Sequence, residues 1–180
     1  MNNLERFVAQ HFENAIALKE RFKSLEKKDW DSITVMMELY VQIGHLFNVM
    51  NDNKDIIEQG RQIDNLGDEI SDVLLQLSYL AHLEGVTFED AGEYGSYPYS
   101  EVDGLSVLGG QLAEAILEKY EYRFDKPREG FASRDDFIKD RIKKMMTIAL
   151  NLGNKANIDL GLEFGLMCAD ATNFVAVRTA

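Results

Sequence analysis

Residues 67–77 read Gly-Asp-Glu-Ile-Ser-Asp-Val-Leu-Leu-Gln-Leu, and the rest of the chain is best interpreted outward from this segment. Glu69 and Asp72 stand three residues apart, just under one helical turn, so both project from the same side of a helix. Two carboxylates so placed could share a hard cation such as Mg²⁺, but acids in a first helical turn also offset the helix dipole without any ligand. The segment and its neighbours carry apolar residues at steps of three and four, the spacing of a buried helical face: Leu66, Ile70, Val73, Leu74, Leu77 and Leu80.

The same helical periodicity covers most of the chain, and no alternating strand pattern stands out, so we expect an all-α fold. Asp31 or Ser32 is expected to cap the second helix, Gly85 to end the third and Ser133 to cap the fifth, which Gly153 and Asn154 would end. The expected helices cover residues 3–27, about 32–50, 62–84, 105–122, 133–152 and 160–177.

A weak internal repeat predicts how these helices are arranged. Residues 68–72 align with residues 140–144, and the apolar positions that follow them correspond as well. Two related helical hairpins that pack together make a helical bundle with extra helices at its ends. We therefore expect a first half at residues 1–90 that carries Glu69 and Asp72, a connector at 91–104, and a diverged second half at 105–180 that packs on the first as one compact domain.

Composition and charge restrict the function. The 180 residues carry a formal net charge of −12, which argues against general binding to nucleic acid or to acidic membranes. Cys168 has no second cysteine with which to form a disulfide, and neither a secretion signal nor an apolar run long enough for a membrane span stands out. We expect a cytoplasmic protein, and a homo-oligomer, because long amphipathic hairpins leave apolar surface that another copy can cover.

Residues 66–74, followed by residues 81–88, resemble the Glu-x-x-Asp helix and the next turn of the MazG-like family of all-α nucleoside triphosphate pyrophosphohydrolases, to which the dimeric dUTPases are related. Residues 41–46 resemble the family segment that normally carries Glu-x-x-Glu, and the likeness extends over roughly residues 33–90. The resemblance implies cleavage of a nucleoside triphosphate to a monophosphate and pyrophosphate, with four carboxylates on two facing helices holding Mg²⁺.

Only half of that motif is present. Glu69 and Asp72 match it, whereas Gln42 and His45 stand where glutamates are expected. Gln42 can offer a metal a neutral oxygen, and His45 a nitrogen that suits Mn²⁺ better than Mg²⁺. Glu38, one turn before Gln42, could complete a rearranged metal site of Glu69, Asp72, Glu38 and Gln42, in which His45 assists the catalytic acids. Alternatively, His45 is hydrogen-bonded between helices and Glu38 is exposed to solvent.

The second half contains no such acidic motif, but it could supply cations to phosphate. Lys126, Arg128 and Arg134 cluster around a predicted helix start, where anions are attracted; a solvated basic surface explains them equally well. The nearby aromatic residues 120, 122 and 124 could stack on a base or pack in the core. Two functions stay open: a metal-dependent nucleotide pyrophosphohydrolase, or an inactive MazG-like bundle that senses a nucleotide or serves assembly. A purely structural helical module has no positive feature in its favour.

Overall fold

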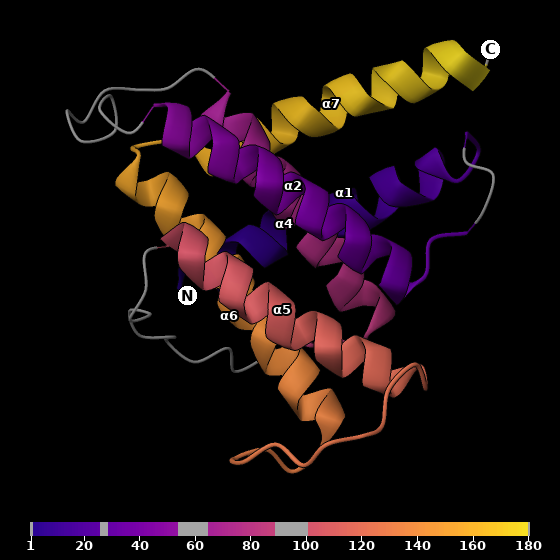
Figure 1. Ribbon diagram of the computed structural model, residues 1–180. Coiled ribbons are helices and arrows are strands. Elements are labelled where there is room, and N and C mark those ends of the chain that lie inside the picture. The colour runs from indigo at the N-terminus through magenta and orange to yellow at the C-terminus, as the bar shows by residue number, and fades with distance from the viewer. Residues whose placement is uncertain (1, 26–28, 54–64, 89–100, 180) are drawn as a thin grey trace.

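The computed structural model describes residues 2–25, 29–53, 65–88 and 101–179, and these residues form helices and connecting turns with no strand among them. The all-α fold is therefore confirmed for this part of the chain. Its helices are α1 (Asn3–Phe22), α2 (Ser32–Asp52), α4 (Leu66–Leu83), α5 (Glu101–Lys119), α6 (Arg134–Lys155) and α7 (Leu160–Thr179), as Figure 1 shows.

Helix α4 lies at the centre of the molecule and packs against α1, α2, α6 and α7 (Figure 1). A helix that is apolar on every side is typical of a position inside a core. Every residue from Ile70 to Ala81 is buried except Asp72. The segment that the sequence singled out is thus the core helix, and Asp72 is the one residue between Ile70 and Ala81 that is not buried.

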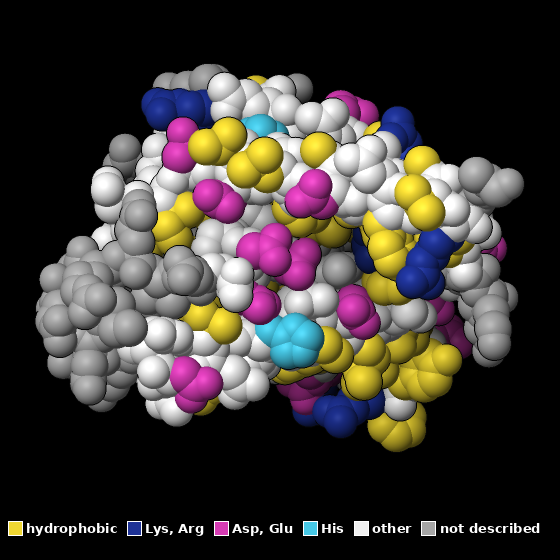
Figure 2. All heavy atoms as spheres, turned by 90° about the horizontal axis from the view of Figure 1, so that it is seen from above, with side chains coloured by type: hydrophobic (Ala, Val, Ile, Leu, Met, Phe, Trp, Pro, Cys, Tyr) yellow, Lys and Arg dark blue, Asp and Glu magenta, His cyan; other side chains and the backbone are white. Residues whose placement is uncertain are grey.

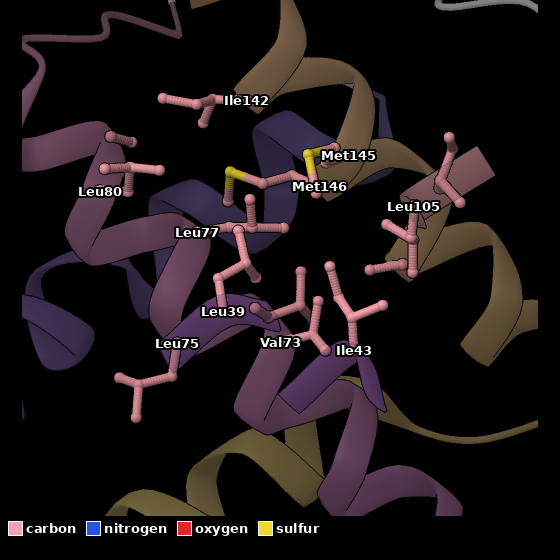
Figure 3. Packing of buried hydrophobic residues seen from close by; sticks show 14 of the residues in the cluster. Leu39, Ile43, Val73, Leu75, Leu77, Leu80, Leu105, Ile142, Met145 and Met146 are labelled. Atoms are coloured by element: carbon pink, nitrogen blue, oxygen red, sulfur yellow. The ribbon is translucent and has the colours of Figure 1, made fainter. Parts of the chain in front are cut away.

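The core forms where α2, α4, α5 and α6 meet. Helix α2 packs along α4, α5 packs along α6, and contacts of α2 with α5 and of α4 with α6 join the two pairs. Figure 3 shows the apolar side chains that meet there, among them Ile43 from α2, Val73 and Leu77 from α4, and Met145 from α6. Leu75 points away from that group (Figure 3).

Helices α1 and α7 form a further layer over α4. They pack against each other and against α4, and the rings of Phe7 and Phe164 meet edge to face with their centroids 5.1 Å apart. Helix α2 lies on α4 as well, but α2 and α7 do not pack against each other. The first half of α4 is therefore left open between them.

Several expected helix ends are confirmed. The Asp31 side chain caps α2 by accepting a hydrogen bond of 2.8 Å from the Thr34 backbone N–H. Gly85 follows α4 with a φ of +61°, a conformation that favours glycine after a helix. Ser133 caps α6, accepting a hydrogen bond of 3.1 Å from the Asp136 N–H.

Other expected ends are wrong. Helix α1 ends at Phe22, before residue 27, and α5 begins at Glu101 and ends at Lys119, so the last residues assigned to the connector are helical. The rest of the connector and residues 62–64 lie outside the described residues, and α4 begins at Leu66. Gly153 and Asn154 lie inside α6, because Gly153 makes room for Leu160: a Cβ at Gly153 would lie 2.3 Å from Leu160 Cδ1.

The expectation that no apolar run is long enough to span a membrane also needs correction. Two helical segments, Ser32–Asp52 and Leu160–Arg178, are long and apolar enough to cross a membrane by length and composition alone. Both place part of their apolar surface against α4, but only 28% and 17% of the two segments, respectively, is buried.

Candidate functional site

Asp72 opens onto a cleft that lies between three helices. The first half of α4 forms its floor, α2 forms one wall and α7 the other, and its volume is about 1050 Å³. Figure 2 shows Asp and Glu side chains gathered over the middle of the face viewed from above. The acidic residues and glutamines that line the cleft are Glu38, Asp68, Asp72, Asp159, Glu163 and Asp170, with Gln42 and Gln76, and no Lys or Arg is among its described lining residues.

The environment of Asp72 disfavours its charged form. Burial, and after it the negative charges of Asp68 and Glu69, raise the pKa of Asp72 to about 6, whereas the positive charges of His45 and Lys19 act in the opposite direction. The acid thus retains a proton more readily than an exposed aspartate does. A cation bound in the cleft would relieve this unfavourable charge.

Glu69 lies next to the cleft rather than in its lining. His45 Nδ1 is 4.0 Å from Glu69 Oε2, beyond hydrogen-bond distance, and that oxygen is buried without a partner. Burial raises the pKa of Glu69, and the positive charge of His45 opposes this. The His45 side chain is 56% exposed, so the expectation of a histidine hydrogen-bonded between helices is wrong.

Glu38 and Gln42 line the α2 wall of the cleft. Gln42 Nε2 donates a long hydrogen bond of 3.5 Å to Glu38 Oε1, while Gln42 Oε1 is buried without a partner. Glu38 is half-buried, so the alternative that it is simply exposed to solvent is wrong. The structure therefore brings Glu38, Gln42 and Asp72 into one cleft, with Glu69 and His45 beside it.

The three basic residues of the second half are elsewhere and have acidic partners. The distances between their charged atoms are 2.7 Å for Lys126 and Glu114, 2.7 Å for Arg128 and Glu118, and 3.5 Å for Arg134 and Asp125. None of the three lines the cleft. The same is true of the aromatic residues 120, 122 and 124, of which Tyr122 and Phe124 are largely exposed.

Sequence reasoning missed five polar residues of the cleft: Asp68, Gln76, Asp159, Glu163 and Asp170. A signal existed for two of them, since Asp68, Asp72 and Gln76 follow one another at four-residue steps and share one face of α4. No local signal marks Glu163, because its place in the cleft depends on how α7 packs against α4.

The chemistry of this donor set suits a hard divalent cation. Carboxylate and amide oxygens are the ligands that Mg²⁺ and Mn²⁺ prefer, and Gln42 Oε1, Glu69 Oε2 and Gln76 Oε1 are buried acceptors without a donor. However, no three His, Cys, Asp or Glu side chains within the described ranges are arranged to hold a metal ion. The ligand types are therefore suitable for a divalent cation, but the side chains would have to rotate before they could coordinate the same ion.

Comparison with known proteins identifies no relative: no family model matches the chain, and no curated protein or solved structure does so either.

Proposed function

We propose that the cleft is the site of a metal-dependent nucleotide pyrophosphohydrolase of the MazG-like type, which cleaves a nucleoside triphosphate to a monophosphate and pyrophosphate. The observation that carries the proposal is Asp72, a half-buried carboxylate that lines an acidic cleft from the mostly buried helix α4. The packing of α2 along α4 and of α5 along α6 supports the expected pair of hairpins.

The cleft is large enough for such a substrate. Its volume of about 1050 Å³ is at the upper end of the usual range for small-molecule sites, roughly 300–1,000 Å³. Phe22 and Trp30 provide part of its apolar surface, and its carboxylates come from α2, α4 and α7 and from Asp159 just before α7. A triphosphate would be repelled by these acids unless a divalent cation accompanied it.

Each residue has a distinct task in this scheme. Asp72 and Glu38, from facing helices, would hold Mg²⁺ or Mn²⁺, with Gln42 as a neutral oxygen ligand. A cation bound there would screen the phosphates and ready a water molecule for attack. Glu69, with its unpaired oxygen beside His45, would orient that water or complete the coordination. Cytoplasmic location and a homo-oligomeric state are parts of the proposal that rest on the sequence.

The test is turnover by the purified protein. We expect wild type with Mg²⁺ or Mn²⁺ to convert at least one nucleoside triphosphate to a monophosphate and pyrophosphate, identified by phosphorus NMR. Asp72→Asn should lose turnover, because an amide cannot replace the carboxylate charge at the cation. Glu129→Gln, an exposed change in the loop after α5, is the control.

A second candidate function is a catalytically inactive bundle that binds a nucleotide for sensing or assembly. Gln42 and His45 in place of glutamates, and the lack of a converged ligand set among the described residues, favour it. No turnover by wild type, together with a nucleotide that still raises its melting temperature, would replace the enzyme with this candidate.

A further inference from the structure

Helix α7 is apolar along most of its length but largely uncovered. Its segment Leu160–Arg178 is apolar enough to cross a membrane, yet only 17% of it is buried. Figure 1 shows α7 along the top edge of the molecule. Exposed apolar surface of this extent is typical of an interaction site.

The exposed side chains of α7 follow a heptad pattern. They are separated by alternating steps of four and three residues, and all five are exposed: Leu162, Leu166, Ala169, Asn173 and Ala176. The two leucines are 58% and 53% exposed. Such a row, which we call the α7 seam, is the surface by which one helix packs against another in a coiled coil. It extends for about 21 Å at the rise of an α-helix.

The two flanks of the α7 seam carry opposite charge. On one flank, Glu163 and Asp170 line the cleft. On the other, Arg21 lines a groove of about 340 Å³ between α1 and α7, and its Nη1 donates a hydrogen bond of 3.2 Å to Thr172 Oγ1. Within the described part of the chain, none of these three charged residues forms an ion pair.

These flanks are complementary to those of a second copy of the chain. A two-fold axis parallel to α7 brings the acidic flank of each copy against the basic flank of the other, whereas an antiparallel pair brings like flanks together. The parallel pair also places Asn173 at the same level in both copies, and a single asparagine in such a seam specifies register and oligomeric state.

We propose that α7 of one copy packs in parallel against α7 of a second copy along the α7 seam, with Arg21 of each copy facing the partner's Asp170. Leu162 and Leu166 belong to both the seam and the cleft lining, so the partner's helix borders the cleft. The inference rests on the homo-oligomeric state that the proposed function includes, and it names the surface that forms the dimer.

A lipid bilayer is the competing explanation for an exposed apolar helix. Glu163 and Asp170 lie inside the apolar segment of α7, and charged side chains within a bilayer are costly. The net charge of −12 also opposes contact with an acidic membrane surface. A second copy, which offers a basic flank to these acids, is therefore the better partner.

The experiment is sedimentation equilibrium of the purified protein over a series of concentrations, with variants that reverse the charge of one flank. Arg21→Glu places acids opposite each other, and Asp170→Arg places arginines opposite each other, so each variant alone should associate poorly. A one-to-one mixture of the two variants restores both pairs and should form a heterodimer. Arg123→Glu, in the exposed loop after α5, is the matched control for charge reversal.

A second pair of variants tests the apolar part of the α7 seam. Leu166→Glu introduces a charge into the seam, and Met37→Glu makes a comparable change at an exposed apolar residue of α2. Because the substituted side chains are exposed or lie at the surface, the variants should fold, and their melting temperatures verify this.

We expect wild type to be a dimer. Leu166→Glu, Arg21→Glu and Asp170→Arg should each raise its dissociation constant about tenfold or more, because like charges then meet across the interface. The mixture of the two charge-reversed variants should associate about as tightly as wild type, and neither control should change the constant by more than about twofold.

A monomeric wild type would overturn the inference, and co-sedimentation of that monomer with phosphatidylcholine vesicles would identify the bilayer as the partner of α7. A dimer that Met37→Glu dissociates and Leu166→Glu does not, or a mixture that fails to associate, would overturn it as well. Sedimentation measures mass and not turnover. A monomer that hydrolyses a nucleotide would therefore contradict only this inference, and a dimer without turnover only the proposed hydrolysis.

Discussion

At the scale of single residues, Asp72 combines burial with unfavourable charge. The other residues of α4 from Ile70 to Ala81 are buried, and burial together with the charges of Asp68 and Glu69 raises the pKa of Asp72 to about 6. A protein that needed Asp72 only for stability would gain by replacing it with a neutral residue. The charge therefore has a stability cost in the metal-free protein, which is typical of a group retained for binding or catalysis.

This cost predicts that Asp72→Asn stabilises the metal-free protein in a pH-dependent way. A raised folded-state pKa means that wild type has its full stability below the unfolded pKa and loses part of it as the pH rises through about 6. The difference in free energy of unfolding between variant and wild type should therefore grow from near zero at about pH 4 to about 3 kcal/mol above pH 6. Urea denaturation at a series of pH values, with a chelator present, measures it.

Asp29→Asn, in the exposed segment before α2, controls for the loss of one negative charge. A difference for Asp72→Asn that stays constant with pH would contradict the account of its environment.

Among the basic residues of the second half, Arg128 has a structural role. Arg128 Nη1 donates a hydrogen bond of 2.7 Å to Glu118, whose side chain is fully buried, and its guanidinium lies 4.6 Å from the ring centre of Phe137. Arg128→Met should lower the free energy of unfolding by about 2 kcal/mol, because it leaves a buried carboxylate without its main partner. Lys126→Met, which breaks an exposed pair, should change it little.

Thermal denaturation of the two variants tests this difference. If both retain stability and both instead weaken nucleotide binding, the phosphate-binding role expected from the sequence is correct and the structural account of Arg128 is wrong.

At the scale of helices, periodicity predicted which segments are helical, and caps predicted only some of their ends. Asp31, Gly85 and Ser133 act locally on the backbone beside them, so a sequence can reveal them. Gly153 looks like a helix end in the sequence, yet it continues α6 because Leu160 fills the space beside it. Its role depends on a tertiary contact that no local pattern encodes.

Two glycine substitutions test this distinction. Gly153→Ala should destabilise the protein by about 1–3 kcal/mol, since its Cβ would lie 2.3 Å from Leu160 Cδ1. Gly44→Ala, in the middle of α2 with no atom within 4 Å of the new Cβ, should stabilise it by about 0.5–1 kcal/mol. Urea denaturation of both variants measures the signs, and a stabilising Gly153→Ala would show that this glycine ends or weakens the helix after all.

At the scale of the whole molecule, the site is a consequence of how α2, α4 and α7 are placed. The sequence predicted Asp72, Glu38 and Gln42 as partners because they lie on two helices with recognisable patterns. It could not predict the α7 wall, with Glu163 and Asp170, because which face of α7 meets α4 is set by long-range packing. The sequence analysis also assigned Lys126, Arg128 and Arg134 to the site as phosphate-binding residues. In the fold they form ion pairs with acids on α5 and in the loop after it.

The central claim is that the cleft between α2, α4 and α7 binds a divalent cation through Asp72. Crystals grown with Mn²⁺ and a non-hydrolysable nucleoside triphosphate, measured by anomalous diffraction, would locate that cation directly. We predict an anomalous peak inside the cleft at about 2.2 Å from a carboxylate oxygen of Asp72. A well-ordered cleft without such a peak, or Mn²⁺ bound only at other acids on the surface, would contradict the account.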